Sequence, residues 1–114
     1  MFIKQFIYFI SIGLNDSDGV PLDERQRVNF IDHVRYAVTS EPAATLIFTG
    51  KGLGHWEGQT EPSYTIAFTL NAPFHVRFAA ESRIVSALER YAKEYRQNSI
   101  ALTCARSTAL IGPS

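Results

Sequence analysis

The first fourteen residues carry a dense run of apolar side chains that predicts a buried strand. Between Phe6 and Ile10 both alternating faces are apolar, which is typical of a central strand covered on both sides. Gln5 and Ser11 interrupt the run, which is also far shorter than the about 20 apolar residues that span a bilayer. We therefore expect a strand from about Ile3 to Leu14 rather than a signal peptide or a membrane span, followed by a turn over residues 15–19.

Two later segments show apolar stripes at helical spacing. Pro21 suits a first helical turn, and a stripe from Phe30 to Val38 predicts a helix of about 18 residues that ends before Pro42. A second helix opens at Pro73. Its predicted stripe consists of Ala80, Ile84, Leu88, Tyr91 and Tyr95. Both helices therefore have one apolar face with which to cover a sheet.

Three further segments alternate with a period of two, which indicates strands. They are residues 44–49, residues 63–70 and residues 99–105. A loop of 13 residues between the first two would be long for a hairpin, so we expect these strands to extend and to turn near residues 57–60. The predicted hairpin therefore forms a long arm that contains several glycines.

The order of these elements predicts the fold class. Strand, helix, strand, strand, helix, strand (β-α-β-β-α-β) is the ferredoxin-like arrangement of an α+β domain. Right-handed crossovers place the first and third strands at the centre of an antiparallel four-stranded sheet, with the two helices on one face. The 114 residues fit a single domain, 1–114. Since no segment remains to cover the other face, we expect a homo-oligomer, a dimer or larger.

The amino-acid composition limits the kinds of ligand and partner that the protein can bind. The 11 basic and 11 acidic residues give a formal net charge of zero, which argues against bulk nucleic-acid binding. Eight of the basic residues are Arg, and this indicates either a lineage bias or a phosphate-binding role. Cys104 is the only cysteine, so it forms no disulfide within the chain; it fits a reducing compartment and is expected in the core. His33, His55 and His75 lie on different predicted elements, so we expect no metal site, and His33 is expected on a solvated helix face.

The glycine-rich arm is the first candidate binding segment. Because a strand follows it rather than a helix, it is not a dinucleotide-binding motif. Gly52 and Gly54 could let either a ligand or a neighbouring chain approach the backbone closely. His55 and Trp56 follow, and the indole offers a flat face for a nucleobase or a plug for a subunit interface.

A second candidate segment links the second helix to the last strand. Arg96 and Gln97 could grip a polar ligand there, although the polar residues after them could equally satisfy backbone groups at the helix end. Arg106, just past the last strand, is a further guanidinium that could hold a phosphate.

No motif assigns catalysis. The chain has no G-x-S-x-G elbow and no evident pair of carboxylates for acid–base chemistry, so we assign no catalytic residue and expect no cofactor. One alternative remains a cofactor-independent enzyme on a dimeric scaffold, with His55 or His75 as the base. Another is a protein–protein inhibitor or assembly module that docks through the exposed sheet face and Trp56.

Several short motifs together resemble a known family. They are Ser11–Asp16, Ala44–Leu46, Gly52–Gly58, Glu61–Tyr64 and Tyr95–Thr103. Their order and spacing are similar to small phage proteins of the first Thoeris anti-defence family. The resemblance implies a non-enzymatic, oligomeric protein in the cytoplasm of a bacterial host. Such a protein sequesters a small phosphorylated nucleotide messenger, of the cyclic ADP-ribose type or a cyclic oligonucleotide, in a pocket between subunits.

Overall fold

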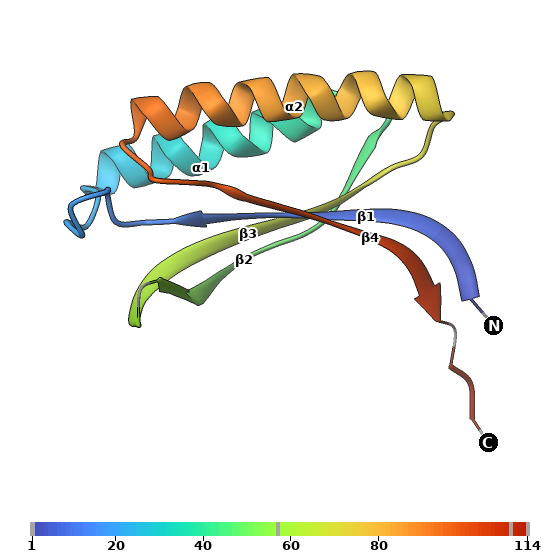
Figure 1. Ribbon diagram of the computed structural model, residues 1–114, viewed down its shortest axis with the longest axis horizontal. Helices are drawn as coiled ribbons and strands as arrows, with labels where there is room; N and C mark the ends of the chain where they lie inside the picture. Colours follow the sequence, from blue (N-terminus) through green and yellow to red (C-terminus); the bar gives the residue numbers. More distant parts are fainter. Residues whose placement is uncertain (1, 57, 110, 114) are drawn as a thin grey trace.

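The computed structural model describes residues 2–56, 58–109 and 111–113, and the side chains of all of these except residues 2–4, 54–56, 59, 107 and 108. Its elements are β1 (Phe2–Gly13), α1 (Glu24–Thr39), β2 (Ala44–Trp56), β3 (Gln59–Leu70), α2 (Phe74–Glu94) and β4 (Ala101–Ala109). The strands pair antiparallel in the order β2-β3-β1-β4. The two helices pack together over one face of this sheet (Figure 1). The predicted ferredoxin-like fold is therefore confirmed, with the first and third strands in the middle.

The core lies between the sheet and the two helices. On β1 and β3, alternate side chains point to the helices and are buried, and the same is true of one stripe on each helix. The members are Tyr8, Ile10, Ile12, Ile66, Phe68, Leu70, Phe30, Val34, Val38, Ala80, Ile84 and Leu88. The Tyr8 ring stacks on the Phe68 ring with centroids 5.1 Å apart, and the Tyr8 hydroxyl donates to Glu81 at 2.8 Å. Burial, with this hydrogen bond, raises the pKa of Tyr8.

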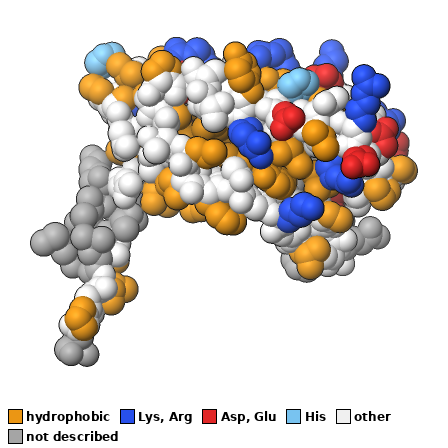
Figure 2. Space-filling model, turned by 180° about the vertical axis from the view of Figure 1, so that it is seen from behind, with side chains coloured by type: hydrophobic (Ala, Val, Ile, Leu, Met, Phe, Trp, Pro, Cys, Tyr) orange, Lys and Arg blue, Asp and Glu red, His pale blue; other side chains and the backbone are white. Residues whose placement is uncertain are grey.

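The other face of the sheet carries no helix. Phe9 on β1 is 38% exposed and Phe48 on β2 is 57% exposed. The strand register places both on this open face, because Phe48 pairs with Ala67 and Ala67 pairs with Phe9. Seen from behind in Figure 2, hydrophobic and uncharged side chains dominate the lower part of the molecule, whereas charged ones gather above and toward the end away from the termini.

The β2–β3 hairpin extends past the helices. In Figure 1 its tip, at the lower left, lies far from both helices. Leu53 on this arm is 72% exposed. The radius of gyration is 15.3 Å, whereas a compact chain of this length would have about 13 Å. The arm therefore projects from the domain.

Three local predictions are wrong. Pro21 is predicted in the first turn of the first helix, but it forms a β-bridge with Asn15 before the helix. The helix instead starts at Glu24, where Asp23 and Gln26 form a capping box. Cys104 is exposed, because on the edge strand β4 the helices do not cover it.

His33 is the third, because it is half-buried between the helices rather than on a solvated face. Its ring stacks on Tyr91, and its Nδ1 lies 2.7 Å from the Tyr95 hydroxyl. Burial raises the pKa of Tyr95, and the neighbouring Glu94 carboxylate adds to the shift.

Within the described residues, neither helix is both long enough and apolar enough to cross a membrane.

Candidate functional site

A polar cleft of about 290 Å³ opens at the end of the sheet where β1 ends and β3 and β4 begin. Three segments far apart in the sequence form its walls: the β1–α1 loop, the start of β3 and the link between α2 and β4. The lining residues are Asn15, Asp16, Ser17, Asp18, Gly19, Thr60, Glu61, Gln97, Asn98 and Ser99. All are polar apart from Gly19, so the cleft is built for hydrogen bonding rather than for apolar contact.

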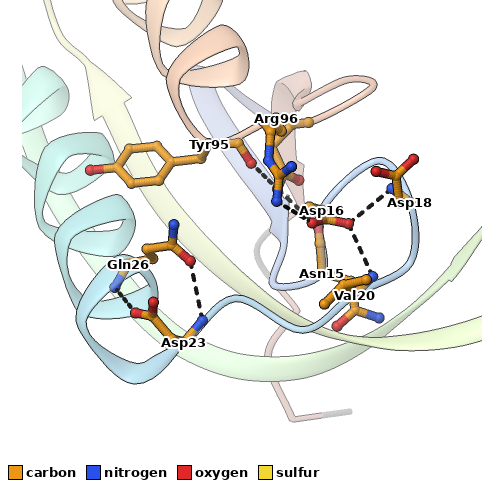
Figure 3. Close-up of polar contacts among 9 residues, drawn as sticks. Asn15, Asp16, Asp18, Val20, Asp23, Gln26, Tyr95 and Arg96 are labelled. Carbon is orange, nitrogen blue, oxygen red and sulfur yellow. Dashed lines mark hydrogen bonds and ion pairs between the residues drawn. The ribbon is translucent and has the colours of Figure 1, made fainter.

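Asp16 organises the β1–α1 loop. Its side chain is only 3% exposed. One carboxylate oxygen accepts from the backbone N–H groups of Asp18 (2.9 Å) and Val20 (3.0 Å), and the other accepts from the guanidinium of Arg96 (2.6 Å; Figure 3). Because a buried carboxylate is stable only when its oxygens are paired, these contacts account for its position. Asp16 is therefore committed to the loop rather than to a ligand.

Two further hydrogen bonds join the loop to the link after α2. The N–H of Ser17 donates to the carbonyl of Arg96 (2.7 Å), and the side-chain amide of Gln97 donates to the carbonyl of Asn15 (2.9 Å). Together with the ion pair of Asp16 and Arg96, they fix two walls of the cleft to each other. The third wall, at the start of β3, meets the loop through the N–H of Leu14, which donates to the carbonyl of Pro62 (2.9 Å).

Glu61 is different from Asp16, because its carboxylate is not committed to another residue. The side chain is half-buried in the cleft wall and lies directly over the backbone of Gly13, where a Cβ atom would collide with it. Among the residues that the structure describes, none forms a hydrogen bond or an ion pair with this carboxylate. A half-buried carboxylate without a partner is suited to accept a donor or a cation from a ligand.

The charge of the cleft is negative. Among the residues that the structure describes, its lining includes Asp16, Asp18 and Glu61 but no Lys, Arg or His. The ion pair with Arg96 neutralises the charge of Asp16, so the carboxylates of Asp18 and Glu61 carry the net negative charge of the described lining. This arrangement attracts a cation or a ligand rich in N–H and O–H donors, and it repels phosphate.

The structure brings together only some of the residues predicted from sequence. Gln97 lines the cleft. Arg96 is not part of the lining, but its guanidinium binds the lining residue Asp16. Gly52 lies on the arm opposite Ser63, and Gly54 pairs with Glu61 of the cleft wall. His55 pairs with Thr60, which also lines the cleft, and Trp56 pairs with Gln59, but the side chains of His55 and Trp56 lie outside the described part of the chain.

Arg106 stands apart from these residues. The prediction that it lies just past the last strand is wrong, because β4 runs from Ala101 to Ala109 and includes it. It lies five residues beyond Ala101, which is about 17 Å at strand spacing, and it is not among the residues that line the cleft.

Sequence reasoning missed Asp16 and Glu61. The turn residues Asn15–Gly19 were recognised only as turn formers, although an Asp that bonds N–H groups two and four residues later is an expected loop organiser. Glu61 stands before Pro62 in a strand, and no local pattern indicates that Gly13 leaves room for it.

A second polar cluster lies on the helix-facing side of the sheet. The Tyr64 hydroxyl accepts from the guanidinium of Arg35 at 3.2 Å. A hydrogen bond from Thr49 lowers the pKa of Tyr64, and Arg35 adds to this effect. As for metals, no three His, Cys, Asp or Glu residues within the described part of the chain gather closely enough to hold an ion.

Comparison with known proteins gives structural likeness only. No protein-family model matches the chain, and no curated protein matches it in sequence, so membership of the anti-defence family stays a prediction.

Among solved structures, a phage SAM lyase in complex with S-methyl-5′-thioadenosine aligns with a TM-score of 0.54 and 18% identity, covering 90% of this chain and 81% of that one. The same type of enzyme in its apo state aligns with a TM-score of 0.53 and 19% identity, over 90% and 81% of the two chains. Ribosomal protein S6 from Thermotoga maritima aligns at 0.52 and 13%, over 91% and 88%. At these identities the likeness establishes the ferredoxin-like fold.

Proposed function

We propose that this protein binds a small, positively charged adenosine derivative in the cleft between the β1–α1 loop and the start of β3. S-adenosylmethionine is the leading candidate. The observation that carries the proposal is the carboxylate of the half-buried Glu61, which has no ion-pair or hydrogen-bond partner among the described residues, in a cleft whose described lining includes no basic side chain. A sulfonium or ammonium group would supply the missing positive charge.

The remaining lining groups suit the rest of such a ligand. The amides of Asn15, Gln97 and Asn98 and the hydroxyl of Ser99 can both donate and accept hydrogen bonds. A ribose diol and an adenine edge offer complementary donors and acceptors. Two structural neighbours that are phage SAM lyases, one holding S-methyl-5′-thioadenosine, support the choice of an adenosine ligand with a sulfur substituent.

The bound ligand has two possible fates, sequestration or cleavage. Sequestration follows from the family resemblance and requires only tight binding. Cleavage is favoured by the lyase neighbours, with Glu61 holding the sulfonium in position for the reaction. It would break the bond between the sulfonium sulfur and the methionine side chain. The sulfur would keep the bonding electrons and leave as neutral S-methyl-5′-thioadenosine, while the four-carbon remainder closes through its own carboxylate oxygen.

A phosphorylated messenger, the ligand class implied by the family resemblance, fits this cleft less well. Its phosphates would face Asp18 and Glu61 without a cation among the described lining residues. Such a ligand would need guanidinium groups from another copy, and Arg106 is the exposed candidate. For this reason we place the cationic ligand first.

We also propose that the working form is a homo-oligomer in the cytoplasm of a bacterial host. The open sheet face, with Phe9 and Phe48 partly exposed, and the projecting arm both present surface that a second copy can cover. The cleft of about 290 Å³ lies just below the range of small-ligand sites, about 300–1,000 Å³, and a second copy would enclose the ligand further. The lone free cysteine is consistent with a reducing compartment.

Ligand binding can be tested by calorimetry with S-adenosylmethionine, S-methyl-5′-thioadenosine and a cyclic ADP-ribose. We expect S-adenosylmethionine to bind at micromolar concentration or better and the phosphorylated ligand to bind more weakly. Mass spectrometry of the mixture then separates the two fates, because intact ligand indicates sequestration and released S-methyl-5′-thioadenosine indicates cleavage. No heat and no product with S-adenosylmethionine at millimolar concentration would refute the proposal.

The oligomer can be tested by light scattering on the wild type and on Phe9→Glu. We expect a mass of at least twice the chain for the wild type and a monomer for the variant, because the new carboxylate would be buried without a partner at the interface. Tyr36→Glu, on the exposed surface of α1, is the matched control and should leave the mass unchanged. A monomeric wild type at 100 micromolar would contradict the proposal.

A further inference from the structure

Arg96 has a backbone conformation that an arginine adopts at a cost. Its φ angle is +51°, and it is the one residue other than glycine with a positive φ in the described part of the chain. It follows Tyr95, the C-cap of α2, and so occupies the position where a glycine usually ends a helix. Glycine would adopt this conformation without strain. The presence of Arg at this position therefore indicates that its side chain has a role.

The N–H of Arg96 donates to the carbonyl of Lys93 at the end of α2 (3.3 Å), and its other contacts lead to the β1–α1 loop. Its carbonyl accepts from the N–H of Ser17 at 2.7 Å, and its guanidinium lies 2.6 Å from the carboxylate of Asp16. Asp16 in turn accepts from the N–H groups of Asp18 and Val20. Figure 3 shows the side chain of Arg96 pointing from this left-handed turn toward Asp16 in the loop.

We infer that Arg96 is a positioning residue, which shapes the cleft through Asp16 rather than by gripping the ligand itself. Arg96 is absent from the lining of the cleft, whereas Asp18 and Gly19, on the loop that it holds, are part of that lining. Asp16 lines the cleft, but its side chain is only 3% exposed and both its oxygens are already paired, so the guanidinium holds a group that is committed to the loop. This inference rests on the proposed function, because it concerns how the same cleft is shaped.

The substitution Arg96→Gly distinguishes the effect of the Arg96 side chain from that of its backbone conformation. The glycine relieves the left-handed conformation but leaves one oxygen of the buried Asp16 carboxylate without its partner, so we expect the thermal midpoint to fall while the fold is retained. Without the guanidinium the loop loosens, and binding of S-adenosylmethionine should weaken about fivefold to tenfold. Arg96→Lys, which keeps the charge, should recover part of the affinity. Arg25→Ala, exposed on α1, controls for the loss of one positive charge.

A double-mutant cycle with Asp16→Asn distinguishes positioning from direct binding. If Arg96 acts through Asp16, each single variant weakens binding and the double variant is no weaker than the worse of the two. If Arg96 touches the ligand, the two effects multiply, and the inference is overturned.

Amide hydrogen exchange tests the same inference without any ligand. In Arg96→Gly we expect the N–H groups of Ser17 and Val20 to exchange about tenfold faster while the core strands are unchanged. Unchanged exchange in the loop would overturn the positioning role. Should the wild type fail to bind S-adenosylmethionine, the proposed ligand is wrong, and the exchange measurement still decides whether Arg96 holds the loop.

Discussion

Replacing Glu61 with Gln is expected to weaken the binding of S-adenosylmethionine about 10-fold to 100-fold and to change the binding of S-methyl-5′-thioadenosine by no more than about twofold. The two ligands share the adenosine and the sulfur, but only the first carries a sulfonium charge. Glutamine keeps the size and the hydrogen-bonding oxygen of Glu61 and removes its charge. A loss confined to the charged ligand would therefore show that the carboxylate acts electrostatically. Calorimetry with both ligands measures the two dissociation constants.

Two further variants sharpen this test. Glu89→Gln removes the same charge from the exposed face of α2 and should alter neither affinity. Gly13→Ala keeps the Glu61 side chain, but the Cβ atom of the new alanine forces the flexible carboxylate of Glu61 out of its position. We expect it to reproduce the loss of affinity for S-adenosylmethionine while the fold is retained. Equal losses for both ligands in Glu61→Gln would instead assign the carboxylate a shaping role and remove the reason for preferring a cationic ligand.

The fold could be predicted because its signals are local and repeated. The stripe from Phe30 to Val38 and the alternation over residues 63–70 each repeat one period several times, so an error at one position changes little. The handedness of the crossovers then selected the strand order. What failed were single positions near edges and ends. Cys104 alternates like a core residue, but the alternation does not reveal that β4 is an edge strand beyond the cover of the helices.

The site was harder to predict because it depends on distance in three dimensions. Asp16 and Arg96 lie in two connecting segments that are 80 positions apart. Glu61 lies between them in the sequence, on β3. Each alone resembles an ordinary turn, cap or surface charge. They can be recognised as parts of one site only when the fold brings the three segments together at one end of the sheet. Gln97 lies at this end of the sheet because it stands just before β4, but its bond to the carbonyl of Asn15 has no signature in sequence.

Phe68→Ala is expected to lower the free energy of unfolding by about 3–5 kcal/mol, because it empties a fully buried site against the Tyr8 ring. That is a large part of the about 5–15 kcal/mol that stabilises a typical domain. Urea unfolding followed by circular dichroism measures the change. If the variant does not fold, Phe68→Leu provides a milder version, with an expected loss of about 1 kcal/mol.

Phe48→Ala is the matched control, because it makes the same substitution in the same sheet on the face without helices. With Phe48 57% exposed, the isolated chain should lose no more than about 0.5 kcal/mol. If a second copy covers this face, the loss should instead grow with protein concentration, because the substitution then weakens association rather than folding. Equal losses at Phe68 and Phe48 in dilute solution would contradict the assignment of the core to the helix-covered face. A loss at Phe48 that appears only in concentrated solution would identify the open face as the surface on which copies meet.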